Sequence, residues 1–216
     1  MPQILKEAAG TAPIPQNDTA GRKALRDSFK QFLDENKSYQ AEVDKHLGSP
    51  HLNGLLSANS LLSSDSPQIV SELQELKDLD QRHLTNIQHF PDIFKTNLTA
   101  AGATTAEVEA FEQGVRKGMS GGFDAVTKSL DLEMKWIDAM VELYQYSGEN
   151  QSHMRARGAS LEFDDETVRQ HFVELSQKVD ALGAQKDQAQ ASFTNAQERS
   201  RQQMGITAQD IGQNGK

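Results

Sequence analysis

The chain has 216 residues, of which 36% are hydrophobic and 25% are charged, and it contains no cysteine. Without cysteine there are no thiol nucleophiles, disulfide frameworks or thiolate zinc sites. The absence of cysteine is compatible with both an oxidising and a reducing compartment, so it does not indicate where the protein is located. The formal net charge is −9, with basic residues scattered among acidic ones. This charge argues against a nucleic-acid partner, because phosphates need a basic face, and no apolar run reaches the roughly 18 residues of a transmembrane span.

Residues 1–17 are predicted to form a flexible N-terminal arm, because prolines there alternate with small and polar residues. A long helix should follow, with Asp18 or Thr19 as its N-cap. Gly48 marks its end. Its apolar residues recur at helical spacing and are Leu25, Phe29, Phe32, Tyr39, Val43 and Leu47.

The segment from Ser49 to Ser66 is predicted to be a loop with about one helical turn. Ser66 and Pro67 then start a second helix, as its N-cap and its first-turn proline. Pro91 should kink or interrupt this helix, because it removes a backbone hydrogen bond and clashes with the preceding turn. Gly102 ends the segment. The apolar positions are Ile69, Val70, Leu73, Leu76, Leu84, Ile87, Ile93, Phe94 and Leu98.

The central feature of the sequence is an unbroken helical periodicity from Thr105 to Tyr146. Thr104 and Glu107 have the spacing of a capping box in front of it. Such a helix would be roughly 60 Å long at 1.5 Å per residue, so other long helices must cover its apolar stripe. That stripe consists of Val108, Phe111, Val115, Met119, Phe123, Val126, Leu130, Met134, Ile137, Val141 and Tyr144.

A break over residues 149–163 separates the central helix from a last helix, which Asp164 and Asp165 should cap. Four long amphipathic segments over residues 18–204 predict an all-α fold: an elongated antiparallel up-down-up-down four-helix bundle. Both termini should be disordered, the second over residues 205–216. The apolar positions of the last helix are Val168, Phe172, Leu175, Val179, Leu182, Ala189, Phe193 and Ala196.

Glycine recurs every fourth residue inside the central helix, at Gly114, Gly118 and Gly122, although glycine disfavours a helix interior. They indicate close helix packing, a local kink, or a groove that faces a ligand. Aromatic residues near the end of the same helix indicate either core packing or a small ligand site. The candidate ligand-binding residues are Met119, Gly122, Phe123, Trp136 and Tyr144.

We predict no catalytic residues, no cofactor and no metal site. Di-iron bundles need Glu-x-x-His pairs, and none of the six histidines has glutamate three residues before it. The paired acids Asp164 and Asp165 are explained more simply as a helix cap than as catalytic groups.

Two short stretches are similar to the YiaF-type family of uncharacterised bacterial lipoproteins. The first comprises Arg22, Lys23, Ala24, Phe29, Phe32 and Leu33, and the second comprises Gly158, Ala159, Ser160, Leu161, Glu162 and Phe163, followed by Asp164. The resemblance implies a helical periplasmic protein with a lipid anchor on a cysteine upstream of the first helix. The sequence departs from that family because it contains no cysteine and no signal segment.

We therefore expect a non-enzymatic protein of the bacterial cell envelope that binds a protein partner and acts as an interaction or scaffold module. The alternative is a small-molecule sensor or carrier that binds a ligand between helices. The expected location is the periplasm or cell envelope, and the cytoplasm is the alternative.

Overall fold

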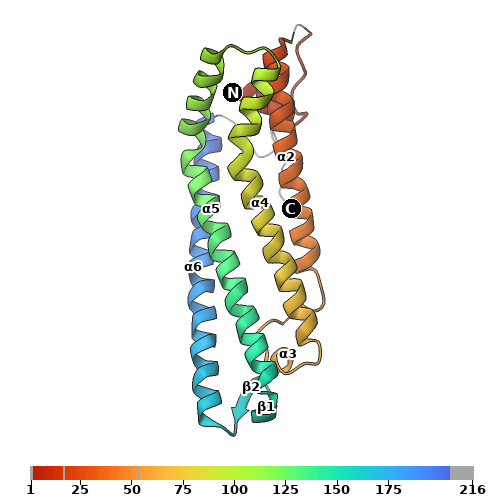
Figure 1. The fold of residues 1–216 in the computed structure, drawn as a ribbon, viewed down its shortest axis with the longest axis vertical. Helices are drawn as coiled ribbons and strands as arrows, with labels where there is room; N and C mark the ends of the chain where they lie inside the picture. The colour runs from red at the N-terminus through yellow and green to blue at the C-terminus, as the bar shows by residue number, and fades with distance from the viewer. Residues whose placement is uncertain (1, 17, 53, 205–216) are drawn as a thin grey trace. The chain divides into compact units, whose positions relative to one another are not determined.

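Helices dominate the computed structural model, which describes residues 2–16, 18–52 and 54–204 (Figure 1). The all-α fold class is confirmed. In chain order the elements are α1 (Pro2–Ala8), α2 (Ala20–Leu47), α3 (Ala58–Leu61), α4 (Ser66–Ala100), α5 (Thr105–Glu149), η1 (Gln151–His153), β1 (Met154–Arg157), β2 (Ser160–Phe163) and α6 (Glu166–Met204). The predicted tail over residues 205–216 lies outside the described residues.

The N-terminal segment corrects the sequence prediction, because residues 2–8 of the predicted flexible arm form helix α1. Ile4 and Ala8 of this helix are buried, at 9% and 7% exposure. Their spacing of four residues places them on one face, and that face packs against the core. Pro2 stands at the first helical position, where its missing N–H costs nothing.

Pro91 does not interrupt α4, which is continuous from Ser66 to Ala100. The residues around it, Phe90 and Phe94, are 3% and 1% exposed and hold both sides of the proline in the core. Tertiary packing therefore overrides the local cost of the lost hydrogen bond.

Contacts within the described chain define two compact units. Unit 1 takes in the described residues of Met1–Tyr39, His83–Thr127 and Ala191–Lys216, and unit 2 those of Gln40–Arg82 and Lys128–Gln190. The four-helix bundle over residues 18–204 stays a prediction.

The core of unit 1 is built from aromatic rings of α2, α4 and α5. Phe29 of α2 meets Phe94 of α4 edge-on, with ring centroids 4.8 Å apart. Phe111 of α5 stacks on the same Phe94 ring at 4.6 Å. Offset and edge-on ring pairs stabilise a core in addition to the stabilisation that comes from burying their apolar area. The buried members of this core are Ile4, Ala8, Phe29, Phe90, Phe94, Leu98 and Val108.

The core of unit 2 centres on α5, where Ile137, Met140 and Leu143 are completely buried. Polar residues join α5 to α6 along this unit: Ser129 Oγ donates to Gln190 Oε1 at 2.9 Å. Lys178 Nζ lies 2.6 Å from Glu142 Oε2. Polar and charged side chains of α5 thus hold α6 against it.

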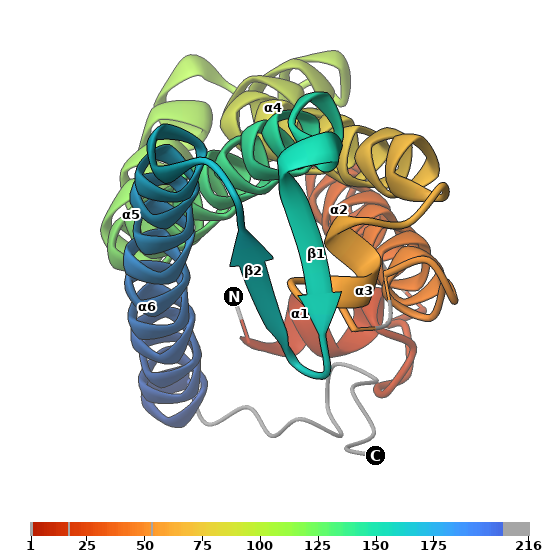
Figure 2. The same cartoon turned by 90° about the horizontal axis from the view of Figure 1, so that it is seen from below.

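A β-hairpin follows α5 in unit 2 and lies beside α3 (Figure 2). Its two antiparallel strands pair Met154 with Phe163 at the open end and Arg157 with Ser160 at the turn. Gly158 begins the two-residue turn with φ +62°, a left-handed conformation that favours glycine. The sequence analysis did not predict this hairpin.

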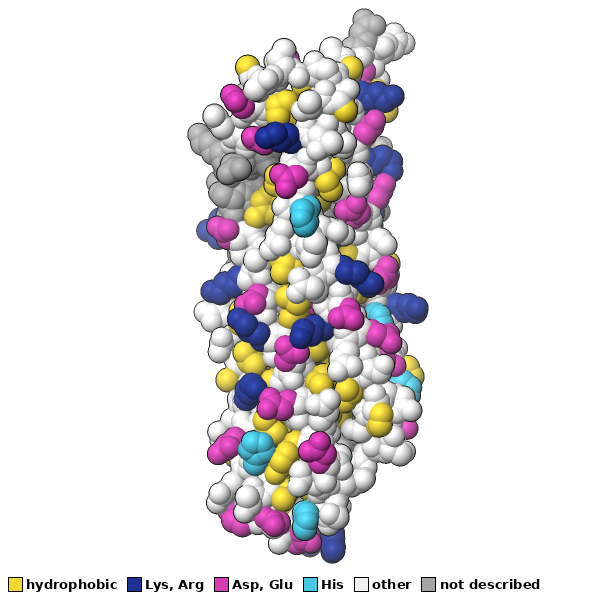
Figure 3. All heavy atoms as spheres, viewed as in Figure 1, with side chains coloured by type: hydrophobic (Ala, Val, Ile, Leu, Met, Phe, Trp, Pro, Cys, Tyr) yellow, Lys and Arg dark blue, Asp and Glu magenta, His cyan; other side chains and the backbone are white. Residues whose placement is uncertain are grey.

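Charged side chains of both signs are interspersed on the face seen in Figure 3, so neither sign gathers into one patch there. Across the described residues, no helix combines the length and the apolar character that crossing a membrane requires.

Candidate functional site

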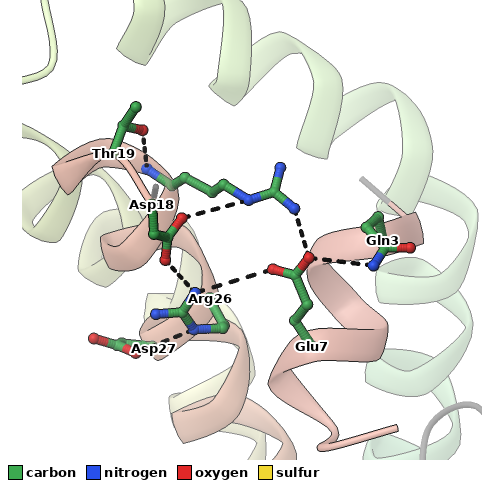
Figure 4. Close-up of polar contacts among 7 residues, drawn as sticks. Gln3, Glu7, Asp18, Thr19, Arg26 and Asp27 are labelled. Atoms are coloured by element: carbon green, nitrogen blue, oxygen red, sulfur yellow. Dashed lines mark hydrogen bonds and ion pairs between the residues drawn. The ribbon is translucent and has the colours of Figure 1, made fainter. Parts of the chain in front are cut away.

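The most buried charges among the contacts described in unit 1 join α1 to the start of α2 (Figure 4). We name Glu7, Asp18, Arg22 and Arg26 the Glu7 cluster. Arg22 Nη2 donates to Glu7 Oε1 at 2.6 Å, and Arg26 Nη1 lies 4.0 Å from Glu7 Oε2. Arg26 Nη1 also donates to Asp18 Oδ2. One carboxylate of α1 therefore faces two guanidinium groups of α2.

Burial makes this arrangement unusual for a surface helix. The Glu7 side chain has 0% exposure, and the side chains of Arg26 and Asp18 have 9% and 13%. Burial of a carboxylate away from water is costly unless charged or hydrogen-bonding partners replace its hydration. Arg22 and Arg26 supply that compensation, so the ion pairs and the docked position of α1 depend on each other.

The hydrogen bonding of the Glu7 cluster is incomplete. Glu7 Oε2, Asp18 Oδ1 and Arg22 Nε are buried and have no hydrogen-bond partner within the described structure. Arg22 Nε and Asp18 Oδ1 are 3.4 Å apart, an ion-pair contact with weak hydrogen-bond geometry. Buried polar groups normally have hydrogen-bond partners. The cluster therefore stabilises the docked position of α1 less than a fully hydrogen-bonded set of the same charges would.

Local sequence explains how the cluster is positioned. Arg22 and Arg26 are four residues apart and therefore share one face of α2. Thr19 Oγ1 accepts a hydrogen bond from the backbone N–H of Arg22 at 3.2 Å, which caps the first turn of that helix. On α1, Gln3 Nε2 donates to Glu7 Oε1 at 3.3 Å. Gln3 and Thr19 thus fix the two sides of the ion pair.

The Glu7 cluster directs two guanidinium groups at one carboxylate. Paired guanidinium groups bind carboxylates strongly and with defined direction. The sequence analysis missed these residues, because Glu7 lies 15 residues before Arg22, the nearer of its two arginine partners. The spacing of Ile4, Glu7 and Ala8 was the one signal that could have indicated an amphipathic α1.

The five predicted ligand-binding residues divide between the units. Met119, Gly122 and Phe123 belong to the α5 segment of unit 1, whereas Trp136 and Tyr144 belong to unit 2. The side chain of Met119 lies outside the described part of the chain.

Two of these residues border the core of unit 1. Phe123 is half-buried and packs against the aromatic core. A Cβ atom added at Gly122 would meet no atom within 4 Å, so open space lies beside this glycine.

Trp136 contacts α6 in unit 2. A Cβ atom at Gly183 would lie 3.4 Å from Trp136 Nε1, so the absence of a side chain at Gly183 accommodates the indole. Lys186 Nζ lies 5.1 Å from the centroid of the Trp136 ring, a cation–π contact. Burial raises the pKa of nearby Glu133, while the charge of Lys186 acts in the opposite direction.

Tyr144 anchors a loop in unit 2. Its ring is 1% exposed, and its hydroxyl donates to Ser60 Oγ at 3.1 Å. The same hydroxyl accepts a hydrogen bond from the backbone N–H of Leu56 at 3.3 Å. Leu56 has φ +66°, a left-handed conformation that is costly for leucine. Tyr144 thus holds a strained turn against α5.

Hollows on the described surface are open rather than enclosed. One of about 490 Å³ runs along a face of α2, and one of about 390 Å³ lies on α6. Their lining residues are Asp27, Lys30, Gln31, Asp34, Glu35 and Ser38 in the first, and Asn195, Glu198, Arg199 and Gln202 in the second. Over the described residues, no three histidine, aspartate or glutamate side chains gather as metal ligands.

Residues 118–122 read Gly-Met-Ser-Gly-Gly, a match to the hydrolase pattern Gly-x-Ser-x-Gly that the prediction of no catalytic residues overlooked. In those hydrolases the serine occupies a sharp turn between a strand and a helix. Here the backbone of residues 118–122 is helical and lies inside α5. The segment therefore lacks the backbone geometry of a nucleophile elbow.

The fold and the Glu7 cluster describe an all-α protein in which a buried carboxylate joins a short helix to a long one. Comparisons with protein-family profiles, with curated proteins and with solved structures each find no match. The similarity to the YiaF-type family stays a prediction.

Proposed function

We propose that this chain is a non-enzymatic interaction or scaffold module of the bacterial cell envelope. The observation that supports it most directly is the Glu7 cluster, in which Arg22 and Arg26 bind a carboxylate presented by a helix. Charge-assisted recognition of a helix is a common means of protein–protein binding. The protein would act through such a surface.

The proposal includes an antiparallel up-down-up-down arrangement of α2, α4, α5 and α6 as the scaffold. In unit 2, α5 and α6 contacts support it, because Ser129 bonds Gln190 while Glu142, further along α5, pairs with the earlier Lys178. Contacts that progress in opposite directions along two helices indicate antiparallel packing.

The location in the envelope, with a lipid anchor upstream of α1, rests on the two stretches similar to the YiaF-type family. Fractionation of cells that express the complete gene from its own promoter tests it. We expect the protein in the membrane fraction, released by detergent. Recovery in the cytosolic fraction would overturn the envelope location and leave the interaction role to be judged separately.

The second candidate is a sensor or carrier with a ligand between helices. The open space beside Gly122, next to half-buried Phe123, favours it. Native mass spectrometry of protein purified from its host distinguishes the two functions. A mass that the polypeptide and any covalently attached lipid account for supports the interaction module, and a small molecule retained without a covalent bond supports the carrier.

A further inference from the structure

Helix α1 covers an apolar surface of unit 1, and we name this surface the groove. Ile4 and Ala8 are buried in the same core cluster as Phe29 and Phe94, and Val108 of α5 completes it. The groove therefore receives one apolar face of a helix, with contacts from three long helices. This is the form in which amphipathic helices are generally bound.

Arg22 and Arg26 border the groove, and Asp18 and Asp27 pair with the same arginines. Glu7 lies between Ile4 and Ala8 on α1, and its carboxylate is the one from α1 that Arg22 and Arg26 face. Buried Glu7 Oε2 has no hydrogen-bond partner, and neither has Arg22 Nε. A carboxylate placed to satisfy both would be held more tightly than the carboxylate of Glu7.

Helix α1 is too short to hold this position alone. It has seven residues, and isolated helices shorter than about 12 residues are marginal in water, so α1 is helical only while docked. The residues that connect it to α2 are mostly exposed, and Ile14 is 58% exposed. Release of α1 would therefore disturb few other contacts.

Several apolar side chains next to the core cluster that holds α1 remain partly exposed. Phe32, Leu33, Phe111 and Phe123 pack against the same core cluster and are only partly buried. A longer helix could bury more of them. The α1 of a second copy could not, because it has the same seven residues.

We infer that this groove is a docking site for an amphipathic helix of a protein partner, and that α1 is the internal segment that covers it. The partner helix presents a glutamate or aspartate between two apolar residues, three positions after the first and one before the second, and extends beyond two turns. The inference rests on the proposed function as an interaction module and names the chemistry of its partner.

The test uses a fluorescent peptide of residues 2–11 and the full chain. In the variant Glu7→Lys, the lysine meets Arg22 and Arg26, so like charges expel α1 and open the groove. We expect the peptide to bind this variant at least tenfold more tightly than the unaltered chain. Asp34→Lys is the matched control, because it makes the same charge change at an exposed position of α2.

Charge reversal tests the recognition itself. A peptide with lysine in place of its glutamate should not bind the Glu7→Lys chain. The chain with Glu7→Lys, Arg22→Glu and Arg26→Glu restores opposite charges, so α1 should close again and exclude the original peptide. Helix content by circular dichroism verifies folding. If Glu7→Lys does not fold, Ile4→Asn weakens α1 through its apolar contact instead.

Equal binding of the peptide to the Glu7→Lys, Asp34→Lys and unaltered chains would overturn the inference. Dimerisation of the opened variant with the unaltered chain would also overturn it, since the groove would then be an interface between copies. A retained small molecule would contradict the proposed function alone and leave the peptide result interpretable.

Discussion

The imidazole ring of His83 lies parallel to the phenol ring of Tyr39, with their centroids 3.8 Å apart and 9° between their planes. Burial lowers the pKa of His83 from 6.5 to about 4, because the charged form would lose its hydration. The unfolded chain therefore binds a proton at this residue before the folded chain does as the pH falls.

The free energy of unfolding should decrease between about pH 6.5 and pH 4 for this reason. The full loss is about 3 kcal/mol, at about 1.4 kcal/mol for each pKa unit. Urea denaturation across this range measures it. His83→Phe keeps the stacked ring and should abolish most of this pH dependence. An NMR titration that finds the His83 pKa near 6.5 would contradict the prediction.

Gly122→Ala should stabilise the protein by up to about 1 kcal/mol, because alanine is the better helix former. The added Cβ atom meets nothing within 4 Å. Gly158→Ala is the matched comparison, since space is also open there but φ is +62°. That variant should lose roughly 1 kcal/mol. Thermal melts of both variants should therefore shift in opposite directions, and a shared direction would refute the backbone argument.

Phe94→Ala should destabilise the protein by roughly 3–5 kcal/mol, the usual cost of removing a buried aromatic ring. Phe94 is 1% exposed and contacts the rings of Phe29, Phe90 and Phe111. Phe123→Ala should cost less, because Phe123 is only half-buried. Chemical denaturation ranks the two variants. A larger loss for Phe123→Ala would show that its ring contributes more to the core than its exposure indicates.

The long helices were predictable from the sequence because their apolar residues recur at helical spacing over many turns. The central helix was expected from Thr105 to Tyr146 and runs to Glu149. The capping box was also predicted, and Glu107 Oε2 accepts the backbone N–H of Thr104 at 2.8 Å. This hydrogen bond lowers the pKa of the Glu107 carboxyl. The capping residues and the apolar periodicity both predict this helix, so either signal is enough to identify it.

Short elements escaped prediction because their stability comes from tertiary contacts. Helix α1 has two turns, too few for a periodic pattern, and its decisive contact joins Glu7 to Arg22. The hairpin strands have four residues each, and only Gly158 signals the turn. The candidate site at the Glu7 cluster was missed for the same reason: sequence spacing does not show which distant charges meet.

Tyr144→Phe should destabilise unit 2 by about 1 kcal/mol, because it removes the acceptor of the Leu56 N–H in a partly buried hydrogen bond. The exchange of the Leu56 amide hydrogen should also accelerate. Tyr146→Phe is the control, since its hydroxyl donates to Val168 O at 3.3 Å and does not contact the loop. Unchanged exchange at Leu56 in Tyr144→Phe would show that other contacts hold the strained turn.

Glu133→Gln should make the protein more stable at pH 7. Burial raises the pKa of Glu133, so the folded state binds its proton more tightly than the unfolded state does. Stability is therefore lost as the pH rises from the unfolded value of 4.5 through the folded pKa, and glutamine avoids this loss. Below pH 4.5, where both states are protonated, the two proteins should unfold at similar urea concentrations.

Lys186→Met completes a double-mutant cycle, because Lys186 offsets the buried charge of Glu133. In the unaltered chain this substitution should destabilise at pH 7, since Glu133 loses its compensating charge. In the Glu133→Gln background it should cost only the contacts of Lys186 with Trp136 and Asp187. Equal losses in both backgrounds would mean that the charges of Glu133 and Lys186 do not interact and that the lysine acts through its other contacts, with Trp136 and Asp187.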